Sequence, residues 1–133
     1  MMYTILAVDD DPESLGVLQQ FLTQEGYRVS TSGSARQALH LVEQSAPSLM
    51  LVNTNLPGLD GLTLCRRLRT NPATVETPVI FMMPPGSSFD VTSALEAGGD
   101  DFIRKPFALR ELSARIRAHL RRTNLGRIPE DTT

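Results

Sequence analysis

The stretch YTILAVDDDPESL, residues 3–15, contains the change from strand to helix that decides the fold. Residues 3–8 form a short continuous apolar run, which is typical of a strand buried on both faces of a parallel sheet. Three aspartates follow this run. Pro12 and Glu13 then favour a helix start, because proline tolerates the first helical position and an acid there complements the helix dipole. The stretch therefore predicts an α/β fold with a polar site directly after its first strand.

The same alternation of strand and helix recurs along the chain. Further strands are predicted over residues 27–31, 49–52, 78–83 and 101–104. Helices are predicted between Pro12 and Gly26, after Ser34, around residues 62–68, around residues 91–95 and from Ala108 to Arg122. The apolar residues expected in the fourth of these helices are Val91, Ala94 and Leu95. Five such units imply one doubly wound parallel sheet with helices on both faces. We expect residues 1–122 to form this domain and residues 123–133, which lose the apolar period, to be a tail or the start of a linker.

Composition narrows the class of protein. The chain has 133 residues, of which 41% are hydrophobic, so it is long enough for a single soluble domain with one core. A net charge of −2 provides no bulk attraction to nucleic acid or to an anionic membrane. No apolar run is long enough to span a bilayer and no secretory signal is visible, which predicts a cytoplasmic protein. The single cysteine, Cys65, excludes an internal disulfide and is expected to be a small core residue.

Polar residues follow several of the predicted strands. In an open parallel sheet the ligand site lies beyond the carboxyl ends of the strands, so these residues are expected to converge on one edge. They are Asp9, Asp10 and Asp11 after the first strand, Asn53 after the third, Met83 and Pro84 at the end of the fourth, and Lys105 after the fifth. Lys105 is the only lysine among 13 basic residues, which hints that a compact ammonium is needed there.

Five motifs in this order resemble a known family. They are ILAVDDDP at 5–12, LPGLDG at 56–61, TPVIF at 77–81, EAGGDDFIRKPF at 96–107 and ELSARIRAHLRR at 111–122. Together they resemble the receiver domain of bacterial two-component response regulators over about residues 3–122. The resemblance implies a flavodoxin-like, five-stranded sheet in the order 2-1-3-4-5. It also implies an aspartate that is phosphorylated by a partner histidine kinase in the presence of Mg²⁺.

The resemblance assigns roles to particular residues. Asp9 and Asp10 match the acidic pair of the family, with Asp10 as the direct metal ligand, and Asn55 matches the position whose backbone carbonyl binds the metal. Lys105 matches the lysine that pairs with the phosphoryl oxygens, and its peptide bond to the following proline is expected to be cis. Phe102 matches the aromatic position that changes rotamer on activation, although it is also expected to serve as core or as partner surface.

Two residues depart from the family pattern. Asn53 stands at the phosphoacceptor position, and an amide cannot form an acyl phosphate. Met83 stands where the family has a small hydroxyl residue, and methionine offers no hydrogen-bond donor. We therefore predict a receiver that works independently of phosphorylation. Without a third carboxylate, Mg²⁺ is expected to bind weakly, and Lys105 is expected to pair with one of the acids.

Two other classes of function remain open. Asp9 and Asp11, Lys105 and the acids at 100–101 are residue types used by haloacid-dehalogenase-like, Mg²⁺-dependent phosphatases, although here the lysine follows the acidic pair, which is the wrong order. Residues 104–127 are rich in arginine with Glu111 as the only acid, which could bind DNA. A solvated helix face is the preferred interpretation of that segment. We expect no enzymatic activity.

The expected partners are proteins, namely a sensor kinase or an output domain. A homodimer through the last two strand–helix units is also expected, with no membrane contact, and with nucleic acid bound only by an output domain outside these residues.

Several other polar side chains are expected to have structural roles rather than roles in the site. Asp100 and Asp101 are expected to cap the turn into the fifth strand, His40 and His119 to face solvent, and Ser87 and Ser88 to belong to a flexible loop, with a substitute site hydroxyl there as the alternative.

Overall fold

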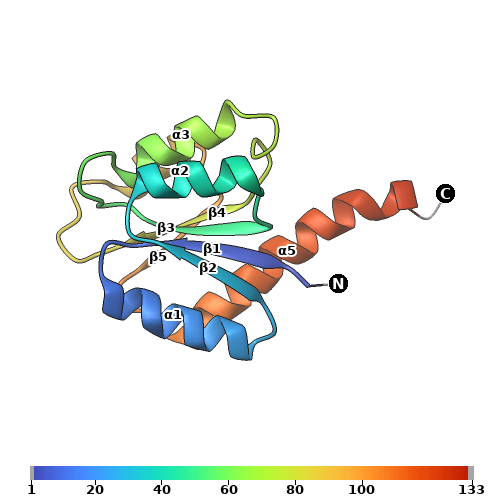
Figure 1. Cartoon of the computed structure of the whole chain (residues 1–133), viewed down its shortest axis with the longest axis horizontal. Coiled ribbons are helices and arrows are strands. Elements are labelled where there is room, and N and C mark those ends of the chain that lie inside the picture. The colour runs from blue at the N-terminus through green and yellow to red at the C-terminus, as the bar shows by residue number, and fades with distance from the viewer. Residues whose placement is uncertain (1, 132–133) are drawn as a thin grey trace.

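The computed structural model describes residues 2–131, with side chains described up to residue 123. Ten elements alternate along this part of the chain (Figure 1). Their bounds are β1 Thr4–Val8, α1 Pro12–Gln24, β2 Arg28–Ser32, α2 Ala35–Gln44, β3 Leu49–Asn53, α3 Gly61–Arg69, β4 Val79–Met83, α4 Val91–Glu96, β5 Asp101–Arg104 and α5 Leu109–Asp131. All strand pairs are parallel, in the order β2-β1-β3-β4-β5. The predicted fold class and strand order are confirmed.

Helices cover both faces of the sheet. Figure 1 shows α1 and α5 on one side and α2 and α3 on the other. Alternate residues of β3 divide between two apolar clusters, since Leu49 and Leu51 pack with α1 and α5 while Met50 and Val52 pack with α2, α3 and α4. All residues of β3 and β4 are buried, as two-sided coverage requires, whereas β2 at the edge is half exposed.

Side-chain caps explain where the helices begin. The carboxylate of Asp11 accepts a hydrogen bond from the Glu13 amide at the start of α1, and Ser34 does the same for Gln37 in α2, as predicted for that serine. Asp60 and Asp90 cap α3 and α4 in the same way. The third aspartate of the DDD run is therefore used for capping α1.

Two expectations about exposure are wrong. Leu95 lies on the outer side of α4 and is 49% exposed, so Ala94 is the one residue of this short helix that the core fully buries. His119 is only 9% exposed, because its Nε2 atom donates to Asp101 Oδ2 at 3.0 Å while Nδ1 accepts from Arg122 at 3.1 Å. His40 is exposed, as expected.

The acids at 100–101 bind neighbouring elements rather than simply capping a turn. Asp100 accepts from the Val79 amide and from Arg69, and Asp101 accepts from Arg115 and His119 on α5. Burial alone would raise the pKa of the Asp101 carboxyl, but hydrogen bonds from His119, the Phe102 amide and Arg115 outweigh it and lower that pKa. Asp101 therefore stabilises the fold above the ordinary pKa of an aspartate, and this contribution is lost as the pH falls through the lowered value.

The last helix extends beyond the predicted domain boundary. The backbone of α5 remains helical through Asp131 and projects past the sheet (Figure 1), although the apolar period ends near Arg122. The boundary at residue 122 stays a prediction, and residues 132–133 of the expected tail lie outside the described residues. No helix within residues 2–131 combines the length and the apolar character needed to cross a membrane.

Candidate functional site

The carboxyl ends of β1, β3, β4 and β5 meet at one edge of the sheet. Asp9 follows β1, Asn53 is the last residue of β3, and Met83 is the last residue of β4. Lys105 follows β5, and its backbone amide donates to the Met83 carbonyl at 2.8 Å. Side chains from positions 9, 53 and 105, distant in sequence, are in direct contact here.

Asp9 is the centre of this site. It is fully buried, and its Oδ2 atom accepts from Lys105 Nζ at 2.5 Å. Its Oδ1 atom accepts from Asn53 Nδ2 at 3.2 Å and from the Asp11 amide at 3.0 Å. A buried carboxylate is stable only when it is paired and hydrogen-bonded, and Asp9 satisfies both conditions without any ligand. The expected pairing of Lys105 with an acid is present, and the acid is Asp9.

Asn53 presents its amide nitrogen to the acids. Besides the bond to Asp9, its Nδ2 atom lies 3.5 Å from Asp10 Oδ1, whereas its Oδ1 atom is buried and has no hydrogen-bond partner among the described residues. The side chain is oriented this way because carboxylates can only accept hydrogen bonds. Gly61, the first residue of α3, packs so closely under β3 that a Cβ atom there would lie 2.2 Å from the Asn53 carbonyl oxygen.

The residues present fit a tight Mg²⁺ site poorly. Mg²⁺ requires nearly octahedral oxygen coordination. Here the carboxylate of Asp9 is already occupied by three donors, which leaves the exposed Asp10, the neutral Asn53 oxygen and the backbone of Asn55. Among the side chains described, up to residue 123, no three His, Cys, Asp or Glu side chains gather to hold a metal ion.

The two positions of the expected switch are apolar and packed. Met83 is 2% exposed and has no hydroxyl neighbour along β4, since Met82 precedes it and Pro84 follows. Phe102 is half buried against the core cluster that includes Phe81, and the guanidinium of Arg104 lies 5.7 Å from its ring centroid. The peptide bond between Lys105 and Pro106 is cis, as the resemblance implied.

Two further polar residues lie at this edge, of which Thr54 received no role from the sequence and Ser87 was expected to be a loop residue or a substitute site hydroxyl. Thr54 is fully buried, and its hydroxyl donates to Asn55 Oδ1 at 2.7 Å. Ser87, expected in a flexible loop, donates to the same oxygen at 2.8 Å. The available signal was the run of three polar residues, NTN at 53–55, directly after a buried strand, together with the turn sequence PPGS at 84–87.

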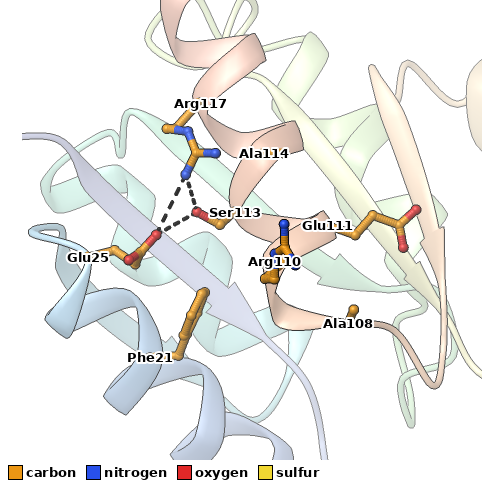
Figure 2. Close-up of a pocket in the computed structure, with 8 residues that line it drawn as sticks. All are labelled: Phe21, Glu25, Ala108, Arg110, Glu111, Ser113, Ala114 and Arg117. Atoms are coloured by element: carbon orange, nitrogen blue, oxygen red, sulfur yellow. Dashed lines mark hydrogen bonds and ion pairs between the residues drawn. The ribbon is translucent and has the colours of Figure 1, made fainter.

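An open cleft of about 620 Å³ lies elsewhere, between α1 and α5 (Figure 2). Phe21 and the alanines at 108 and 114 form its apolar part. At one side Ser113 donates to Glu25 at 2.6 Å and accepts from Arg117 at 2.6 Å, which ties the end of α1 to α5. None of the residues predicted for the site lines this cleft.

The placement of the acids argues against a dehalogenase-like phosphatase. Asp11 is engaged in capping α1, with Glu13 and Ser14 as its donors. Asp100 and Asp101 lie at the start of β5, where the strands begin, whereas Lys105 follows the end of β5. The carboxylates and the lysine that such an enzyme would need are therefore not gathered at one edge.

Comparison with known proteins agrees with this arrangement. The family model for the response regulator receiver domain matches residues 5–117. The chain is 39% identical over 121 residues to the transcriptional regulatory protein AfsQ1 of Streptomyces coelicolor, covering 91% of this chain and 52% of that protein. It is 39% identical over 122 residues to the DNA-binding response regulator MtrA of Mycolicibacterium smegmatis, covering 92% and 52%. The chain thus spans about half the length of these curated relatives.

Solved structures give the same result. A putative response regulator from Chloroflexus aurantiacus superimposes with a TM-score of 0.83 at 33% identity, covering 90% of this chain and 98% of that one. The signal receiver domain of a histidine kinase from Syntrophus aciditrophicus gives a TM-score of 0.82 at 31% identity, covering 89% of each chain. The strand order, the acids and lysine at one sheet edge, and the match over most of the chain show that this protein belongs to the receiver domains of two-component response regulators.

Proposed function

We propose that this receiver domain transmits its signal without phosphorylation of residue 53. The observation that carries the proposal is Asn53 itself, at the end of β3, with its amide nitrogen directed at Asp9 and Asp10. Covalent catalysis at phosphorus needs a nucleophile such as a carboxylate, and an amide is not one. Lys105, which would otherwise neutralise an incoming phosphoryl group, is held by Asp9.

Met83 supports the same proposal independently. A phosphoryl group at this edge would need hydrogen-bond donors, and the buried thioether of Met83 supplies none. Phe102 then has no phosphate-dependent trigger. Its ring is held between the core and Arg104. The domain is proposed to act as a non-catalytic binding module in one fixed arrangement.

Mg²⁺ is proposed to bind weakly, and this can be measured by isothermal titration calorimetry. We expect Asn53→Asp to bind Mg²⁺ at least about tenfold more tightly than the natural protein, because it adds a carboxylate beside Asp10. Asn71→Asp makes the same charge change at a distant position, where the side chain accepts from the Ala73 amide, and should leave the affinity unchanged. Equal affinities for the natural protein and Asn53→Asp would contradict the proposed metal site.

The proposed partners are proteins. Two relatives are named as a transcriptional regulatory protein and a DNA-binding response regulator, and this chain matches about half of each. We infer that it contacts a sensor kinase or an output domain in the cytoplasm and that nucleic acid is bound only by such an output domain. On α5, Arg115 and Arg122 are engaged with Asp101 and Asp100, which disfavours a DNA-binding role for this helix.

A self-association surface is proposed on α4, β5 and α5. The exposed Leu95 provides an apolar contact on α4. The same strand–helix units carry two ion pairs, Asp101 with Arg115 and Asp100 with Arg122. Exposed apolar side chains and charged side chains of both signs are both common in protein interfaces.

A further inference from the structure

The loop between β4 and α4, residues 84–90, is fixed at its start by a tight turn. The Ser87 amide donates to the Pro84 carbonyl at 3.2 Å, and Gly86 has a φ of +76°. A type II turn requires a positive φ at its third position, here Gly86, and proline, here Pro85, is common at its second position. The sequence PPGS therefore directs Ser87 to one defined place.

The hydroxyl of Ser87 is fully engaged there. It donates to Asn55 Oδ1 at 2.8 Å and accepts from the Phe89 amide at 3.2 Å, and it lies 3.3 Å from the Thr54 hydroxyl. Thr54 in turn donates to the same Asn55 oxygen at 2.7 Å. One amide oxygen thus accepts from two hydroxyls that come from loops on neighbouring strands.

We propose that Thr54, Asn55 and Ser87 form a clasp that holds the β4–α4 loop onto the β3–α3 loop and thereby sets the position of α4. The residues after Ser87 transmit this constraint, since the Phe89 ring packs on the core and Asp90 caps α4 through the Ser93 amide. The helix α4 has six residues and buries only Ala94 completely, so its own packing is small and it depends on the loop before it.

The clasp lies beside the proposed site and shares Asn55 with it, since the clasp uses the Asn55 side chain and the expected metal position uses the Asn55 backbone carbonyl. Asn53 and Lys105 both donate to Asp9, whereas Thr54 and Ser87 both donate to Asn55, so the two groups of hydrogen bonds have no side chain in common. The position of the α4 loop is then determined by side chains of the chain itself, and no anion at Lys105 is needed for it. This inference goes beyond the proposed function and holds whether or not residue 53 can be modified.

Hydrogen exchange measured by mass spectrometry tests the clasp, with Ser87→Ala compared to Ser88→Ala. Ser88 is the exposed neighbour, and its side chain makes no hydrogen bond within the described residues. We expect the amides of residues 86–96 to exchange about tenfold faster in Ser87→Ala, because two hydrogen bonds are lost, while amides of β1 and β3 keep their natural rates. Ser88→Ala should exchange like the natural protein throughout.

Variants of Thr54 provide a second, independent test of the clasp by the same measurement. Thr54→Val removes only the hydroxyl and should accelerate the same amides, and Thr54→Ser should restore their protection. If Thr54→Val destabilises the whole domain, the amides of β1 and β3 will also exchange faster. In that case the exchange rates of Ser87→Ala alone test the clasp. Natural exchange rates over residues 86–96 in Ser87→Ala, or equal acceleration in Ser88→Ala, would overturn the clasp.

Discussion

Changing Asn53 to Asp together with Met83 to Thr will produce a protein that gains one phosphoryl group from acetyl phosphate and Mg²⁺. The new carboxylate can attack phosphorus with acetate as the leaving group, and the threonine hydroxyl can donate to a phosphoryl oxygen. Lys105 is already at this edge, within reach through its contact with Asp9. The intact mass of the double variant should rise by one phosphoryl group, and fragmentation should place it on residue 53.

The single variants separate the two contributions. Asn53→Asp should be phosphorylated more slowly than the double variant, because Met83 supplies no donor to the phosphoryl group. Met83→Thr should not be phosphorylated at residue 53 at all. A double variant that binds Mg²⁺ but remains unmodified would show that the edge has lost more than its nucleophile and its hydroxyl.

Gly61→Ala will strongly destabilise the fold. The added Cβ atom would lie 2.2 Å from the Asn53 carbonyl oxygen and 3.0 Å from Val52 Cγ1. Because the first contact is with backbone, it cannot be relieved by a rotamer change, and α3 would have to move away from β3. We expect urea denaturation to show a loss of about 3 kcal/mol in the free energy of unfolding.

Gly16→Ala is the matched control. Gly16 lies inside α1, and a Cβ atom there would meet nothing within 4 Å. Since alanine has the higher helix propensity, this variant should gain up to about 1 kcal/mol. Unfolding curves for Gly61→Ala and the natural protein that coincide would refute the close packing of α3 on β3.

Much of the fold could be predicted because the buried strands are short apolar runs bounded by turn residues. The third strand was expected over residues 49–52 and spans Leu49–Asn53, and the fourth was expected over 78–83 and spans Val79–Met83. The meeting of Asp9, Asn53 and Lys105 at one edge followed from the geometry of parallel sheets. The strand order came from the resemblance to receivers, since apolar periodicity alone does not rank strands.

Cys65 was also predictable from its place in a helical apolar pattern. It is fully buried on α3. Burial raises the pKa of its thiol to about 11, so the group stays protonated at neutral pH and is not a reactive nucleophile. The assignment of Cys65 to the core is confirmed.

Away from the carboxyl ends of the strands, contacts between side chains far apart in sequence could not be predicted. Arg69 donates to the carbonyls of Gly98 and Thr77 and to Asp100, yet on its helix it resembles any basic residue of the last turn. Likewise, His119 is buried because Asp101 lies on the neighbouring strand. Such partners depend on how the elements pack, which local sequence patterns do not encode.

The most direct test of the central claim is the intact mass of the natural protein after incubation with acetyl phosphate and Mg²⁺. An unchanged mass is predicted, because Asn53 offers no nucleophile and Lys105 is paired with Asp9. A gain of one phosphoryl group, mapped to the sheet edge that carries residues 9, 10 and 53, would contradict a receiver that works without phosphorylation.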